Sequence, residues 1–201
     1  MHKSFILYPP IGIAGAARSG KDTLCKGLIS YFNSLNIQAT RRSIAGDTVK
    51  SDLKDLLSEK FNINSFTEDF DEKESIRPLL VEYGKLQRLK SKGRYFIEKF
   101  EFTPEYVNII PDIRYVEYPE DEVNWLKNQV NGLLIFIRRK GVFDANDTEK
   151  VNNKIIKNYA DIQIEWDTLK EEDELFQHAK NIVENYYKLH FKKVTTYSLD
   201  S

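Results

Sequence analysis

Hydrophobic positions along the chain follow two periods, and their alternation predicts the order of the elements. Short runs rich in isoleucine, valine and leucine are separated by longer stretches in which apolar residues recur every three or four positions. This order is typical of βαβ units around a parallel sheet. The predicted strands cover 11–14, 40–45, 107–110, 133–137 and 161–166, and the predicted helices cover 21–35, 48–61, 75–86, 120–131, 149–159 and 171–188.

Polar and turn-forming residues predict where these elements begin and end. The stretch 62–75 contains asparagine, serine and a run of acidic residues, so an exposed loop is expected there. Ser75 is predicted to cap the next helix, with Pro78 in its first turn. The strand at 107–110 is expected to end at Pro111 and Asp112. The last residues, 189–201, have no clear period and are predicted to form a tail.

Composition places the chain among ordinary globular proteins. Its 201 residues suit one domain, and 41% hydrophobic with 30% charged residues excludes a disordered or fibrous protein. Lysine and arginine number 30 against 31 acidic residues, for a net charge of −1. Because proteins that bind polyanions usually carry a basic excess, no nucleic acid polymer is expected as a partner.

Cysteine, histidine and apolar runs exclude several further classes. A single cysteine, Cys25, and three scattered histidines cannot form an internal disulfide or a cysteine-rich zinc site. No apolar run approaches the roughly 18 residues that span a bilayer, and the apolar N-terminal stretch is too short for a signal peptide. A cytoplasmic protein without a membrane partner is therefore expected, and a homodimer is left open.

A glycine-bounded segment follows the first predicted strand and matches the G-x-x-x-x-G-K part of a P-loop. It consists of Gly15, Ala16, Ala17, Arg18, Ser19, Gly20 and Lys21, followed by Asp22 and Thr23. Glycines let a backbone wrap around a polyphosphate, the next helix presents its positive N-terminus, and the lysine reaches the β- and γ-phosphates. The segment therefore predicts ATP as a ligand; the alternative is an ordinary strand-to-helix turn.

Metal binding at this loop departs from the usual pattern. Asp22 stands where most P-loops carry the serine or threonine that holds Mg²⁺, and Thr23 comes one position later. Asp22 could hold the metal directly or through water, although without a cation it would repel phosphate. Asp112, at the end of a predicted strand, is the candidate for the second metal-side carboxylate. Its alternative is a plain Pro–Asp turn.

The loop and three later segments together resemble the virus-type deoxynucleoside monophosphate kinases, a branch of the P-loop nucleoside monophosphate kinases. The later segments are Ile44-Ala45-Gly46-Asp47 with Lys50, Ile76-Arg77-Pro78-Leu79-Leu80 with Tyr83, Gly84 and Arg88, and Asp112-Ile113-Arg114-Tyr115. The resemblance covers most of 11–170, and its P-loop is the only segment that is specific by itself. It implies Mg²⁺-dependent phosphoryl transfer from ATP to a deoxynucleoside 5′-monophosphate, in the host cytoplasm if the protein is encoded by a virus.

The resemblance also implies an architecture. It predicts an α/β fold of the P-loop NTPase type, with a parallel five-stranded sheet flanked by helices. The chain would be one kinase domain over 1–201, with a core at about 10–46, 105–138 and 160–188. A helical insertion at about 47–104 would bind the monophosphate, and a lid would cover about 139–159.

The predicted site combines these segments with arginines, which suit phosphate because they form bidentate hydrogen bonds and remain charged. Arg77 and Arg88 lie eleven residues apart, about three helical turns, and so near one face of a helix. The expected catalytic residues are Lys21, Arg18, Arg77 and Arg138, and the expected substrate-binding residues are Asp47, Lys50, Arg77, Tyr83, Arg88 and Arg114. For each arginine the alternative is a solvated surface.

Two other functions agree with the same loop. A kinase of another small metabolite, of the dephospho-coenzyme A or phosphomevalonate type, would keep the fold and change the acceptor. A non-catalytic ATP-binding regulator would use nucleotide occupancy as a switch, and the aspartate at position 22 makes that alternative worth testing.

Overall fold

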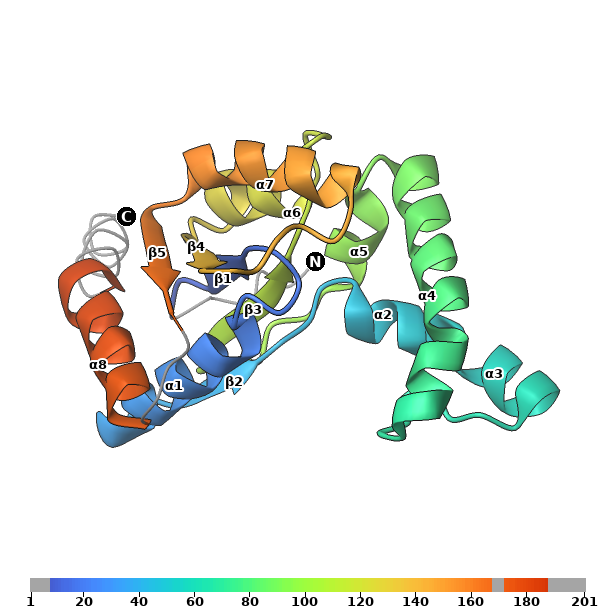
Figure 1. Ribbon diagram of the computed structural model, residues 1–201, viewed down its shortest axis with the longest axis horizontal. Coiled ribbons are helices and arrows are strands. Elements are labelled where there is room, and N and C mark those ends of the chain that lie inside the picture. Colours follow the sequence, from blue (N-terminus) through green and yellow to red (C-terminus); the bar gives the residue numbers. More distant parts are fainter. Residues whose placement is uncertain (1–7, 168–171, 188–201) are drawn as a thin grey trace.

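A computed structural model describes residues 8–167 and 172–187 and contains a five-stranded, all-parallel sheet (Figure 1). The strand order is β2-β3-β1-β4-β5. The strands are β1 (Ile11–Ala14), β2 (Ala39–Arg41), β3 (Val107–Ile113), β4 (Leu133–Arg139) and β5 (Ile162–Trp166). The prediction of an α/β protein with five parallel strands is therefore confirmed. Within the described ranges, no helix is both long and apolar enough to cross a bilayer.

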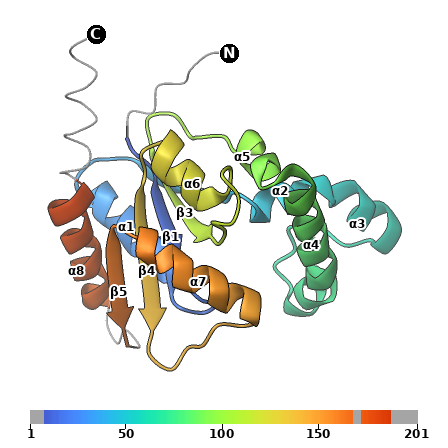
Figure 2. The same ribbon diagram turned by 90° about the horizontal axis from the view of Figure 1, so that it is seen from above.

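Helices cover both faces of the sheet, because successive strand residues point to opposite sides. Ile11 and Ile13 pack on one face with α1 (Lys21–Ser34), α8 (Glu172–Ile182) and a π-helical turn, η2 (Val183–Tyr187). Ala14, Leu134 and Phe136 pack on the other face, under α6 (Glu122–Asn124), the π-helical turn η1 (Trp125–Gln129) and α7 (Asp147–Tyr159). Figure 2 shows these two layers on either side of the sheet.

A group of helices between β2 and β3 extends from one end of the sheet (Figure 1). It consists of α2 (Gly46–Asp52), α3 (Lys54–Phe61), α4 (Phe70–Ser91) and α5 (Arg94–Lys99). The single helix predicted for 48–61 is interrupted at Leu53, whose backbone leaves the helical region (φ −97°, ψ 3°). This turn keeps Val49, Leu53 and Leu57 buried in one apolar cluster.

The predicted loop at 62–75 is shorter than expected, and the prediction of a cap at Ser75 is wrong. α4 begins at Phe70, and the Asp69 side chain accepts a hydrogen bond of 2.9 Å from the Glu72 backbone N–H. An aspartate followed three residues later by a glutamate is a helix-start signal, and Asp69 with Glu72 caps this helix in place of Ser75. Pro78 consequently lies inside α4 and not in its first turn.

Other boundaries shift by a few residues. β2 begins at Ala39 and ends at Arg41, well before the predicted end at residue 45. β3 continues through Asp112 to Ile113, and the helix predicted for 120–131 is a short α6 followed by η1. The predicted tail at 189–201 lies outside the described residues. Because hydrogen bonding with neighbouring strands decides where a strand ends, the apolar pattern alone does not fix these limits.

Candidate functional site

The loop between β1 and α1 follows a backbone path that requires glycine at two points. Gly15 has φ +143° and Gly20 has φ +96°. A Cβ on Gly15 would lie 2.2 Å from the carbonyl oxygen of Ile137, and one on Gly20 would lie 2.6 Å from the Trp166 ring. Arg18, between them, also has a positive φ of 63°. Left-handed residues alternating with ordinary ones are the conformations from which anion-binding nests of N–H groups are built.

The ammonium group of Lys21 lies inside this loop. Its Nζ donates hydrogen bonds of 2.8 Å to the Gly15 carbonyl and 2.6 Å to the Ala16 carbonyl. Burial, followed by the positive charge of Arg114, lowers the pKa of Lys21 to about 8. Its hydrogen-bond acceptors are neutral carbonyls, and nearby carboxylates raise its pKa less than burial and Arg114 lower it, so an anion in the loop would stabilise the charged form.

The N-terminus of α1 adds donors to the same place. The first N–H groups of a helix have no acceptor within the helix, and no side chain caps this one. The neighbouring Ser19 is buried, and its hydroxyl is one of three buried side-chain polar atoms without a hydrogen-bond partner in the described part of the chain. Its carbonyl accepts a 2.9 Å hydrogen bond from Trp166 Nε1, which fixes the loop against β5. The loop therefore presents unsatisfied donors beside a cation.

The register of the sheet brings the end of β3 next to this loop. Ala14 pairs with Ile113 of β3 and with Phe136 of β4, so the residues that follow all three strands lie at one edge. Arg114 and Asp112 both act electrostatically on Lys21, as do Asp22 and Glu149. Ligands of open parallel sheets bind at this edge, outside the carboxyl ends of the strands.

Asp112 joins β3 to the start of α2. Its carboxylate accepts hydrogen bonds from the Ser43 hydroxyl at 2.6 Å, from the Ile44 N–H at 3.2 Å and from the Gly46 N–H at 3.5 Å. A carboxylate has about four acceptor positions, so these contacts leave capacity for a further ligand. The Pro–Asp turn considered from the sequence does not form here, because Pro111 and Asp112 lie within β3.

The expected metal ligands can be compared with the needs of Mg²⁺. Among the described residues no three histidine, cysteine or acidic side chains converge on one point. Asp22 and Thr23 are exposed, and the Asp22 carboxylate lies 3.4 Å from Arg41 Nε. Mg²⁺ in nucleotide enzymes usually takes one or two protein carboxylates and completes its shell with phosphate and water. Asp22, Thr23 and Asp112 offer the oxygen donors that Mg²⁺ prefers, and three side chains are too few for an all-protein cage.

A cavity of about 300 Å³ opens beside the loop, between α2, α4 and the end of β3. Four of its lining residues are cationic (Arg41, Lys50, Lys85 and Arg114) and two are acidic (Asp47 and Asp112). Its apolar wall consists of Ala45, Val49, Leu80, Val81, Phe96 and Tyr115. The excess of positive charge suits an anion, and the apolar wall suits a flat or aliphatic group attached to that anion.

Three of the predicted substrate-binding residues line this cavity: Asp47, Lys50 and Arg114. Arg77 does not, although it precedes Val81 by one turn of α4 and therefore lies along the same helix face. Its guanidinium is largely exposed and lies 3.0 Å from Glu74. The structure therefore does not place Arg77 in the cavity lining, and only its position one turn before Val81 relates it to this site.

Two other predicted residues are engaged elsewhere. Arg88 donates to Asp121 at 2.8 Å and to Glu117 at 3.0 Å, and its guanidinium lies 4.1 Å from the centre of the Tyr115 ring. The Tyr83 hydroxyl donates to Asp52 at 3.3 Å, away from the cavity lining. Both arginines lie in α4, but their eleven-residue spacing could not show that a buried carboxylate already holds Arg88.

The expected lid region contributes a contact that the sequence analysis missed. Glu149, in the first turn of α7, accepts a 3.0 Å hydrogen bond from the Ala17 N–H of the loop and a 2.5 Å bond from the Ala145 N–H. Asn146 followed by Glu149 is a capping-box pattern, which signals a helix start but not its contact with a loop far away in the sequence. Arg18 and Arg138, expected near the transferred group, are both exposed at this edge.

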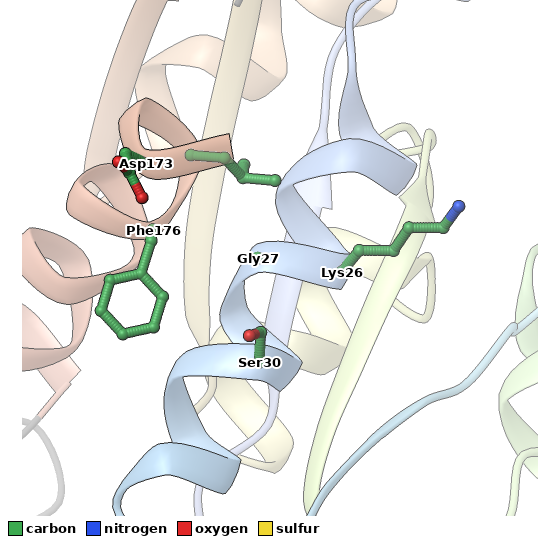
Figure 3. A pocket seen from close by; sticks show the side chains of 6 residues that line it. Lys26, Gly27, Ser30, Asp173 and Phe176 are labelled. Atoms are coloured by element: carbon green, nitrogen blue, oxygen red, sulfur yellow. The ribbon is translucent and has the colours of Figure 1, made fainter. Parts of the chain in front are cut away.

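Two other cavities lie in the described part of the chain and lack the features of this site. One, of about 240 Å³, is a groove between α1 and α8 lined by Lys26, Gly27, Ser30, Asp173, Leu175 and Phe176. Figure 3 shows Lys26 extending away from α8, so its charge does not converge with that of Asp173. The other, beside α2 and α5, is wide and polar, at about 690 Å³. Neither is lined by residues at the end of β3, although the second shares Ser43 and Asp47 with the candidate cavity.

Comparison with known proteins adds no identification. A scan against models of known protein families finds no match, and a search of curated proteins finds none.

Proposed function

We propose that this protein is a P-loop kinase that transfers the γ-phosphoryl group of ATP to the 5′-phosphate of a nucleoside monophosphate, with a deoxynucleotide as the expected acceptor. One observation carries the proposal: Lys21, inside a glycine-bounded loop, adjoins Asp112 and Arg114 at the rim of a cationic cavity. A donor loop and an acceptor cavity at one sheet edge are what transfer between two bound anions requires.

The donor would occupy the loop at 15–21. Its phosphate oxygens would accept hydrogen bonds from loop N–H groups and from the N-terminus of α1. Lys21 would exchange its two carbonyl contacts for phosphate oxygens, which compensate its charge better. The Ala17 N–H would become available once the Glu149 carboxylate moves away.

The acceptor would occupy the cavity beside α4. Arg114 and Lys50 would bind its phosphate, and Asp47 is suited to accept a hydrogen bond from a sugar hydroxyl. Phe96 and Tyr115 are the rings in the lining, so they replace Tyr83 as candidates for contact with the base. Arg77 of α4, with Arg18 and Arg138 near the loop, would neutralise the charge that develops between donor and acceptor.

The chemistry needs alignment more than acid–base groups. An oxygen of the acceptor phosphate is already anionic; it forms a bond to the γ-phosphorus while the bond from that phosphorus to the β–γ bridging oxygen breaks, releasing ADP. Asp22, Thr23 and Asp112 would hold Mg²⁺, which when bound neutralises phosphate charge. The region at 139–159 would act as a lid, because water reaching the site could accept the phosphoryl group instead.

A second candidate acceptor is a phosphorylated metabolite that is not a nucleotide. Arg88 and Tyr83 are used in internal contacts, and the cavity lining given by the described residues includes no asparagine, glutamine or histidine to read a base edge. Such a pocket would select a ligand by its charge and its apolar shape more than by the hydrogen-bond pattern of a base.

The deciding experiment is a coupled assay of ADP release with each deoxyribonucleoside and ribonucleoside monophosphate, in the presence of ATP and Mg²⁺. We expect at least one deoxynucleotide to stimulate ATP consumption and to be recovered as its diphosphate. If no nucleotide stimulates turnover while a phosphorylated metabolite does, the nucleotide assignment is wrong and the second candidate holds. Tight ATP binding by calorimetry with no stimulation by any acceptor would indicate a regulator.

A further inference from the structure

Glu122 is a buried carboxyl group that the proposed function does not use. It is only 4% exposed, and its Oε2 accepts hydrogen bonds of 2.5 Å from the Arg114 N–H and 3.2 Å from the Tyr115 N–H. Burial, followed by the charge of Asp112, raises the pKa of Glu122 to about 8, while the Arg114 N–H and guanidinium act in the opposite direction. A buried carboxyl that holds two adjacent backbone N–H groups imposes a local conformation.

The two residues it holds are the first after β3, and both line the acceptor cavity. Fixing the N–H groups of Arg114 and Tyr115 fixes the direction in which each side chain leaves the backbone. The rest of this segment is anchored separately, because Asp121 accepts from the Tyr118 N–H at 2.7 Å and from Arg88 at 2.8 Å. Hydrogen bonds to Glu122 and Asp121 therefore hold the segment that carries Arg114 at both of its ends.

We propose that Glu122 is a positioning residue for the acceptor site, which it serves by holding the backbone of Arg114 and Tyr115 so that the Arg114 guanidinium faces both the cavity and Lys21. The inference rests on the proposed function, since it assigns Arg114 to the acceptor phosphate. Glu122 does not touch the cavity itself and acts only through the residues that it holds.

This role differs from a purely structural one in what its loss would change. A structural carboxyl would, when removed, weaken donor and acceptor binding alike or lower only stability. A positioning residue for Arg114 would raise the KM for the acceptor. At pH 7 it would leave the KM for ATP unchanged, because Lys21 is charged there with or without Arg114 nearby and the loop at 15–21 does not depend on the 114–122 segment for its glycine-defined path.

The test compares Glu122→Gln, Glu122→Ala and Glu120→Ala in the full chain. The amide side chain of Glu122→Gln keeps an oxygen that accepts the same N–H groups, so this variant should retain wild-type kinetics. Glu122→Ala should raise the acceptor KM about tenfold or more without changing the KM for ATP. Glu120 belongs to the same segment and is half exposed, so Glu120→Ala is the matched control and should change neither. If Glu122→Ala does not fold, Glu122→Asp, shorter by one methylene, replaces it.

A second measurement does not depend on the identity of the acceptor. Titration with inorganic phosphate, followed by NMR at the Arg114 Nε–H, should perturb that signal in the wild type and in Glu122→Gln but not in Glu122→Ala. The inference would be overturned if Glu122→Ala left the acceptor KM unchanged or raised the KM values for ATP and acceptor equally. It would also be overturned if phosphate left the Arg114 signal of the wild type unchanged. If no monophosphate supports turnover, but phosphate perturbs the Arg114 signal in the wild type and in Glu122→Gln and not in Glu122→Ala, the proposed function fails and the positioning role stands.

Discussion

The loop at 15–21 and the cavity beside α4 both present positive charge to the same sheet edge, but they are built in different ways. The loop is a run of consecutive residues whose path follows from two glycines at positive φ. The cavity takes its lining from α2, α4, α5 and the end of β3, which are far apart in the sequence. The comparison teaches that consecutive residues define the path of the loop, whereas the lining of the cavity depends on which side chains the fold leaves available.

Replacing Lys21 tests the loop and should have the largest effect. Lys21→Ala should lower turnover by roughly 100- to 1000-fold or more, because the ammonium compensates charge at the transferred group. Its fold should be retained, since Lys21 contacts only loop carbonyls. The measurement is coupled ADP release with circular dichroism as a check on folding. Lys26→Ala is the control, because Lys26 is an exposed lysine of the same helix; equal turnover in both variants would remove the proposed donor site.

Replacing the two arginines of α4 one at a time tests which of them stabilises the fold and which is free to bind an acceptor at the cavity. Arg88→Ala leaves the buried Asp121 carboxylate without its guanidinium partner and should lower the free energy of unfolding by about 3 kcal/mol. Arg77→Ala removes only an exposed ion pair and should change it by less than about 0.5 kcal/mol. Urea denaturation of both variants measures the difference. A stable Arg88→Ala with a raised acceptor KM would instead support the original expectation that Arg88 binds phosphate.

Lys21 should also give the loop a distinctive pH dependence. Its pKa of about 8 in the free protein means that the charged form is lost above that pH. Because kcat/KM for ATP reports ionisations of the free protein, it should fall about tenfold per pH unit above pH 8 and stay level just below it. The pKa is lowered by folding, so the unfolded chain binds more protons between about pH 8 and 10.5, and the free energy of unfolding should rise with pH over that interval.

This pH dependence can be checked with Lys21→Arg, since arginine stays charged over the whole range. The ATP affinity of that variant, measured by calorimetry, should not fall between about pH 8 and 10. A fall in ATP affinity that is the same in the wild type and in Lys21→Arg would assign the titration to another group.

The contact between α7 and the loop should have the smallest effect. Glu149→Gln keeps an oxygen for the Ala145 N–H but removes the negative charge beside Lys21, so ATP should bind about two- to fivefold more tightly. Asp147→Asn removes a carboxylate from the same helical turn without touching the loop and should leave ATP affinity unchanged. Calorimetry with ATP and Mg²⁺ measures both. Weaker binding in Glu149→Gln would indicate that this carboxylate assists the donor.

The sequence by itself determined the α/β class, the five strands and the position of the glycine-bounded loop, because hydrophobic period and glycine placement are properties of neighbouring residues. It also put Asp47, Lys50 and Arg114 among the candidates that the fold gathers around one cavity. Only the tertiary structure decided that Asp121 holds Arg88, that Asp52 holds Tyr83, and that Glu122 and Glu149 reach backbone N–H groups of other segments. Those contacts depend on burial and on distances between residues far apart in the chain, which local spacing does not encode.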